Sequence, residues 1–139
     1  MLLSRKITTH RRSGAALVEA AFVLPVLFLL IFGFMEMARM GMAFQLITNA
    51  AIQCCRIAVI DGYSQSDVTS RAQNILAEGG IPSGTYTLTS TPGDVSTTHH
   101  GDTVTVSISV PYRNIAWLTP LFLSTATLKS SSMLSSERP

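Results

Sequence analysis

Charged residues and cysteines are scarce in this chain of 139 residues. Only 13% of the residues are Asp, Glu, Lys or Arg, whereas 47% are hydrophobic, and two are cysteine. Two adjacent cysteines cannot form a disulfide framework, so the chain is not a disulfide-rich mini-protein. The length allows one membrane helix and one domain of about a hundred residues, and it is too short for two full cores.

Motifs of the common enzyme classes are also missing. The sequence has no G-x-S-x-G, H-E-x-x-H, P-loop or G-x-G-x-x-G pattern. His99 and His100 stand near Asp94 and Asp102, but their spacing is not that of a metal site. We therefore expect no enzyme, no metal, no cofactor and no small-molecule substrate.

Basic charge is concentrated near the N-terminus. Four of the ten Lys and Arg residues precede Ala15 and none of the eight Asp and Glu residues does, so removing that segment changes the net charge from +2 to −2. The segment after the leader is mildly acidic, so the basic pI of about 8.8 of the whole chain is no argument for nucleic-acid binding. We expect no nucleic-acid partner.

The sequence does contain one long apolar run, from Ser13 to Met40. Residues 20–35 include no charged or polar side chain. At ~1.5 Å per residue, residues 15–35 match the ~30 Å hydrocarbon core of a bilayer. The basic residues before the run are Arg5, Lys6, Arg11 and Arg12. The positive-inside rule then places the N-terminus in the cytoplasm and the chain after about Met40 outside.

Glu19 is the one carboxylate near the start of this run. An acid at such a position costs about 2 to 3 kcal/mol, so it is a functional hypothesis by default. The alternative is that Glu19 lies one turn inside the membrane and reaches back to the headgroups. These residues alone leave both interpretations open.

The spacing between Gly14 and Glu19 resembles that of a known processing site. Gly14 ends a basic leader and stands five positions before Glu19, as in the processing site of the type IV pilin superfamily, where a prepilin peptidase cuts after the glycine. Residues 11–40 resemble the TadE-like minor pseudopilins of Tad (Flp, tight-adherence) pilus systems. The matching positions are Gly14, Glu19, Leu24, Pro25, Phe32, Gly33, Glu36 and Arg39.

The resemblance implies a precursor that is cleaved after Gly14 and anchored by one span in a bacterial inner membrane, with its C-terminal domain in the periplasm. It implies as partners prepilin peptidase, TadF-like and TadG-like pseudopilins, the major Flp pilin and the Tad platform proteins. Entry into the pilus itself is left open. The alternative is an uncleaved single-span protein whose outer domain binds a ligand, and an anchored enzyme is the least favoured interpretation.

Cleavage would give Glu19 a physical role. The new α-amino group of Ala15 has a pKa near 8 in model peptides and needs a partner in a low-dielectric environment. Glu19 of a neighbouring subunit would supply that partner and set the axial register between helices. Pro25 lacks an amide donor and predicts a disturbance near Ala21, either an ordinary kink or a local melt that lets the helix enter a filament.

Cys54 and Cys55 are neighbours on the predicted helix. Their side chains point about 100° apart, so a disulfide between them is disfavoured. Two interpretations remain: buried thiols that act as small apolar fillers, or thiols that crosslink subunits in an oxidising compartment.

Periodicity predicts an α+β fold of pseudopilin type. The first helix continues to about Ile60 with a polar stripe at Gln45, Thr48, Asn49, Gln53 and Arg56. A second helix begins at the capping pattern of Ser64 and Asp67 and buries Val68, Ala72, Ile75 and Leu76. Three strands of a small antiparallel sheet are predicted at 85–91, 103–111 and 122–133. The predicted divisions are a leader (1–14), a transmembrane helix (15–35), its periplasmic continuation (36–61) and a small head (62–139).

Overall fold

The structure, a computed structural model, describes residues 10–116 and 123–137, with side chains from Gly14 onward. The chain divides into two compact units, Met1–Met35 and Glu36–Pro139. Helix α1 (His10–Ala58) begins in the first unit and ends in the second.

Residues 14–35 of the N-terminal unit form a helix with apolar side chains on all sides. Phe22 is 75% exposed, and large apolar residues from Leu17 to Met35 are exposed around the whole circumference. The most apolar window of α1 has a mean hydropathy of 2.6, and none of it is buried. Such a surface suits lipid rather than water. Among the described residues, this one helix is therefore consistent with single-pass membrane anchoring.

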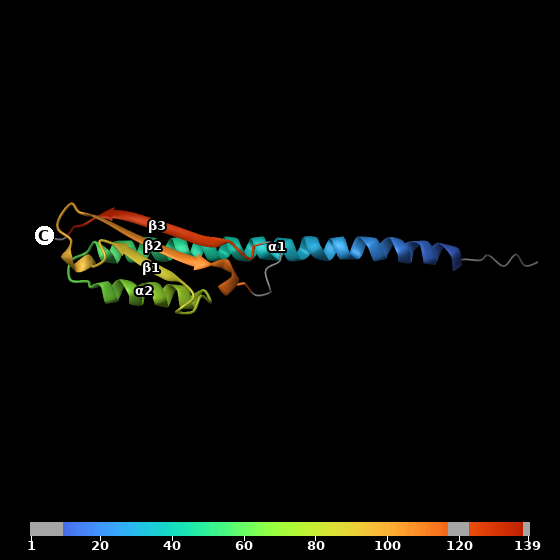
Figure 1. The fold of residues 1–139 in the computed structure, drawn as a ribbon, viewed down its shortest axis with the longest axis horizontal. Helices are drawn as coiled ribbons and strands as arrows, with labels where there is room; N and C mark the ends of the chain where they lie inside the picture. The colour runs from blue at the N-terminus through green and yellow to red at the C-terminus, as the bar shows by residue number, and fades with distance from the viewer. Residues whose placement is uncertain (1–9, 117–122, 138–139) are drawn as a thin grey trace, which may run out of the picture. The chain divides into compact units, whose positions relative to one another are not determined.

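The C-terminal unit contains the last part of α1, a second helix and a sheet (Figure 1). Helix α1 ends at Ala58, slightly before the predicted Ile60, and Gly62 adopts a left-handed backbone (φ 85°) in the turn that follows. Helix α2 spans Gln65–Glu78 with Ser64 as its N-cap, as predicted. The Asp67 carboxylate accepts hydrogen bonds from Ser64 N (2.8 Å) and Ser64 Oγ (2.6 Å).

The sheet has three antiparallel strands in the order β1-β2-β3. They are β1 (Thr87–Thr91), β2 (Thr103–Pro111) and β3 (Thr127–Ser135). The predicted bounds of β2 are confirmed. Strand β1 begins two residues later than predicted, and β3 is shifted toward the C-terminus; the predicted start of β3 at Phe122 lies outside the described residues.

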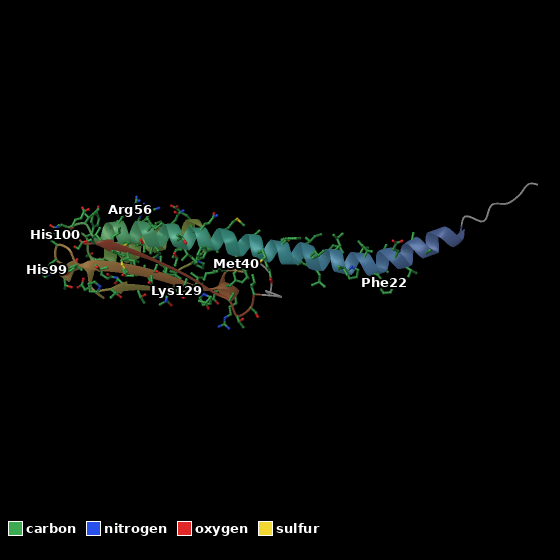
Figure 2. The ribbon with its side chains drawn as sticks, turned by 90° about the horizontal axis from the view of Figure 1, so that it is seen from above. Phe22, Met40, Arg56, His99, His100 and Lys129 are labelled. Carbon is green, nitrogen blue, oxygen red and sulfur yellow. The ribbon has the colours of Figure 1, made fainter. Side chains whose placement is uncertain are left out.

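Helices α1 and α2 cover one face of the sheet, and the core lies between them (Figures 1 and 2). Strand β2 supplies the central row of the core, in which every second side chain is fully buried: Val104, Val106, Ile108 and Val110. Facing them on α1 are Ile47, Ala51, Cys54, Cys55 and Ala58, and on α2 Val68, Ala72 and Leu76. Small residues on α1 let it approach the β-branched row closely. The predicted α+β fold is confirmed.

The opposite face of the sheet consists almost entirely of hydroxyl side chains. The alternation that buries Val106 and Ile108 directs Thr105, Ser107 and Ser109 outward. The outward residues of β1 are Thr87, Thr89 and Thr91, and those of β3 are Thr127, Lys129, Ser131, Met133 and Ser135. We call this surface the hydroxyl face; Lys129 is its one charged residue.

Candidate functional site: the first helix and its contacts with the sheet domain

The predicted processing residues lie on the first described turns of α1. Gly14, Ala15 and Glu19 are all helical and exposed. No atom lies within 4 Å of the position that a Cβ on Gly14 would take. Ala15 and Glu19 are four residues apart, so they share one face of the helix. Cleavage after Gly14 and the register role of Glu19 stay predictions.

Pro25 lies inside α1, which remains α-helical on both sides of it. Residues 21–25 are assigned to the helix without a break. The proline has no N–H to donate to the carbonyl four residues earlier. A kink or a local melt at this point stays a prediction.

The two cysteine sulfurs point to different partners within the core. Cys54 Sγ donates to Val68 O on α2 at 3.5 Å, and Cys55 Sγ lies 3.5 Å from the carbonyls of Val104 and Ser132 in the sheet. Both are free thiols with no exposed surface. Burial raises the pKa of Cys54 to about 11 and also raises the pKa of Cys55. This geometry favours the filler interpretation over the crosslink.

Sequence reasoning missed a cluster that joins α1 to the end of β2. Tyr112, which begins the short 3-10 helix Tyr112–Asn114, is 1% exposed, and its Oη donates to Glu36 O at 3.1 Å. Arg39 Nε donates to Ile115 O at 3.3 Å. Burial raises the pKa of Tyr112, the Glu36 carboxylate raises it further, and Arg39 lowers it. Glu36 and Arg39 thus hold the sheet domain to α1 directly after the apolar run.

The same cluster reaches the end of α2. Arg39 Nη2 lies 3.8 Å from the position that a Cβ on Gly80 would take. Gly80 follows α2, so the guanidinium stands near the carbonyl end of that helix, where a positive charge is favourable. A tyrosine directly after a buried strand was the available sequence signal, but its partner is 76 residues away along the chain.

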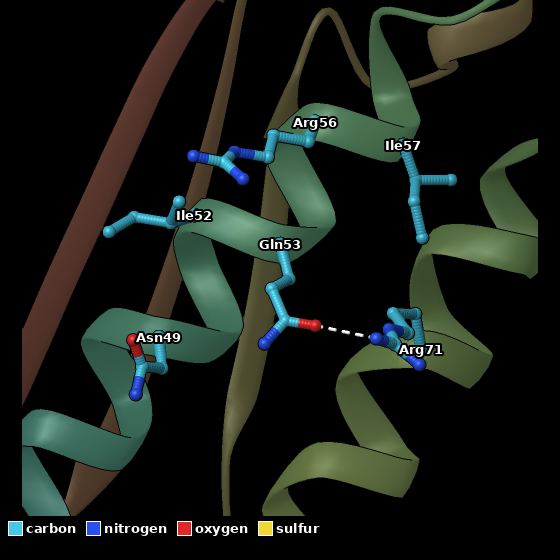
Figure 3. Close-up of a pocket in the computed structure, with 6 residues that line it drawn as sticks. All are labelled: Asn49, Ile52, Gln53, Arg56, Ile57 and Arg71. Atoms are coloured by element: carbon cyan, nitrogen blue, oxygen red, sulfur yellow. Dashed lines mark hydrogen bonds between the residues drawn. The ribbon is translucent and has the colours of Figure 1, made fainter.

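A shallow groove of about 550 Å³ lies between α1 and α2 (Figure 3). Its lining residues are Asn49, Ile52, Gln53, Arg56, Ile57 and Arg71. Arg71 Nη2 donates to Gln53 Oε1 at 2.6 Å, which ties the two helices together. Asn49, Gln53 and Arg56 of the predicted polar stripe line this groove. Its lining includes no nucleophile and no carboxylate.

The His99 and Asp102 pair lies in the loop before β2. His99 Nδ1 is 3.9 Å from Asp102 Oδ2, and the His99 side chain is 82% exposed. Among the described residues, no three His, Cys, Asp or Glu side chains gather in a way that could hold a metal ion. The Asp102 carboxylate instead accepts from His99 N at 2.8 Å and shapes the turn.

These features define a protein with one apolar N-terminal helix and a small α+β domain built on the continuation of that helix. A family model described as TadE-like protein matches residues 14–56. The match begins at Gly14 and ends at Arg56, within α1, and it confirms the predicted TadE-like resemblance over that segment. No curated protein and no solved structure matches the chain.

Proposed function

We propose that this chain is a minor pseudopilin of a Tad pilus system. One observation carries the proposal: the TadE-like match starts at Gly14 and includes Glu19, the two residues that the processing hypothesis needs. The match supports a component associated with Tad pilus machinery, and the apolar part of α1 is consistent with a membrane anchor. The proposal adds cleavage after Gly14, a periplasmic sheet domain and the role of a minor pseudopilin.

In this proposal the leader is removed after Gly14 in the inner membrane. The new amino group of Ala15 then carries a positive charge near neutral pH, and Glu19 of an adjacent subunit neutralises it. The sheet domain lies in the periplasm and contacts other Tad components: TadF-like and TadG-like pseudopilins, the major pilin and the platform proteins. The chain is not an enzyme.

The test is the N-terminal residue of the full chain in its native membrane. We expect intact mass to show a chain that starts at Ala15 in cells with an active prepilin peptidase, and the full precursor in cells without it. A Gly14→Val chain should stay uncleaved in both strains because a branched side chain replaces the hydrogen at the cleavage position. A wild-type chain that keeps its leader in peptidase-active cells would contradict the proposal and favour an uncleaved, membrane-anchored binding protein.

A further inference from the structure

Strand β3 is a long edge strand of regular geometry. It pairs with β2 residue for residue over nine positions, from Thr127 opposite Pro111 to Ser135 opposite Thr103, and the pairing contains no bulge. Its sequence TLKSSSMLS contains no proline and one charge, Lys129. Proteins usually protect an edge with charges, proline or a bulge. Among the described residues, no strand pairs with the other side of β3.

The direction of the unpaired backbone groups follows from the ladder. Tyr112 N donates to Ala126 O at 2.9 Å, and Ser136 N donates to Asp102 O at 2.7 Å. Because bonding alternates along an antiparallel strand, the even-numbered residues of β3 bond to β2. The N–H and C=O groups of Lys129, Ser131 and Met133 therefore point toward the open edge.

Apolar side chains of α1 lie uncovered on the same side. The contact of Cys55 Sγ with Ser132 O places that side of α1 over β3. Phe44 is three helical turns before Cys55 on the same face and is 48% exposed, and Ile52 is 37% exposed. In Figure 3 the Ile52 side chain points away from Arg71 on α2 and toward the side on which β3 runs. We call Phe44 and Ile52 the α1 shoulder.

We infer that β3 accepts a fourth strand from a different protein. Main-chain bonds to Lys129, Ser131 and Met133 would bind an extended segment. Its alternate apolar side chains would pack on the α1 shoulder, and a carboxylate on its other face would pair with Lys129. The segment is thus an alternating apolar and polar sequence with an acid.

A second copy of this chain fits the edge less well. Strand β3 carries Lys129 and no acid. Two copies of β3 paired at this edge would therefore bring two positive charges and no carboxylate to the joint surface.

The probe is a fluorescent peptide as long as β3, in which valine and threonine alternate and one threonine is replaced by glutamate. We expect it to bind the full chain in detergent micelles, and hydrogen exchange to slow at the amides of β3 and not at those of β1. The variant Ser131→Pro removes an outward N–H and leaves the bonds to β2 intact, so it should weaken binding about tenfold or more.

Two further variants separate edge binding from unfolding. Ser90→Pro removes an outward N–H from the other edge strand and should leave binding within about twofold. Ile52→Asn changes the α1 shoulder and leaves the sequence of β3 unchanged. It should weaken binding about tenfold, the loss expected when the apolar contact of one isoleucine side chain with the bound segment is removed. Equal binding by wild type and Ser131→Pro, protection at β1, or no saturable binding would overturn the inference. A dimer of the full chain that Ser131→Pro dissociates would also overturn it, because the occupant would then be a second copy.

Discussion

The Tyr112 hydroxyl donates a hydrogen bond to the backbone carbonyl of Glu36, 3.1 Å away, and so ties the end of β2 to the first turn of α1 beyond the apolar run. Tyr112 is 1% exposed, so no water replaces this bond without local opening. Glu36, whose carbonyl accepts this bond, lies within the TadE-like match of residues 14–56. The bond therefore gives a position of that matched segment a role in the stability of the sheet domain.

The first prediction concerns this bond. Tyr112→Phe should lower the free energy of unfolding by about 0.5 to 1.5 kcal/mol, the net value of one such hydrogen bond. The measurement is urea unfolding of the full chain in micelles. Tyr86→Phe is the matched control, since Tyr86 is half-buried and packs against the same core. An equal loss in both variants would show that the Glu36 contact adds nothing.

The second prediction concerns the close approach of the two helices. A Cβ on Gly79 would overlap Leu46 Cδ2 and lie 3.0 Å from Leu46 Cγ. Gly79→Ala should therefore destabilise the domain by about 1 to 3 kcal/mol, less if Leu46 rotates aside. Gly93→Ala, where no atom lies within 4 Å, should change stability far less.

A double variant tests the assigned cause of that loss. Leu46→Ala removes the overlapping atoms, so the double variant should be more stable than the sum of the two single losses predicts. Strict additivity would mean that Leu46 is not the obstacle.

The third prediction concerns the thiols. The pKa of Cys54 is raised to about 11 from an ordinary value of 9.0. The unfolded chain therefore loses this proton first, so the thiol contributes stability below pH 9 that is lost as the pH rises toward 11. Iodoacetamide at pH 8 should label both cysteines only after unfolding in urea, because the thiolate reacts and the folded thiols are buried. A dimer on non-reducing gels of native membranes would instead favour the crosslink interpretation.

The fourth prediction concerns the start of α2. Hydrogen bonds from the Ser64 hydroxyl and amide lower the pKa of Asp67. The stabilisation is therefore present above the unfolded pKa of about 3.9 and is lost as the pH falls through the lower folded value. Asp67→Asn should reduce the thermal midpoint at pH 7, and the difference from wild type should shrink toward pH 2. A difference that stays constant down to pH 2 would mean that the carboxylate charge is irrelevant.

The fifth prediction concerns Glu19. Glu19→Gln should be cleaved normally but assemble poorly, because a neutral amide cannot neutralise the amino group of Ala15 in a low-dielectric contact. Intact mass measures cleavage, and copurification with the other pilus components measures assembly. Glu78→Gln, an exposed acid at the end of α2, is the control. Normal assembly of Glu19→Gln would remove the register hypothesis.

Local signals in the sequence predicted much of this fold. Strand β2 was placed residue for residue because Val104, Val106, Ile108 and Val110 alternate with hydroxyl residues on a central strand, where one face must be buried. Helix α2 followed from Ser64 and Asp67, since a capping pattern fixes a helix start within a few residues.

The edges and the long-range contacts were harder to predict. Four of the nine residues of β3 are serine, so its apolar pattern is too weak to set its bounds. Strands β1 and β3 also have a partner on one side only. The contacts of Arg39 with Ile115 and of Tyr112 with Glu36 join residues 76 positions apart. No periodicity in the sequence encodes such pairs. Likewise, the different partners of Cys54 and Cys55 depend on which side of α1 each element packs against.

The hydroxyl face has a consequence for the environments that this domain can tolerate. Hydroxyl groups both donate and accept hydrogen bonds and do not titrate between acid and alkaline pH. Their contacts with water carry no net charge for dissolved ions to screen. Apart from Lys129, the outward surface of the sheet should therefore keep the same hydration in fresh water, in brine and in acid, while the charged loops around it change.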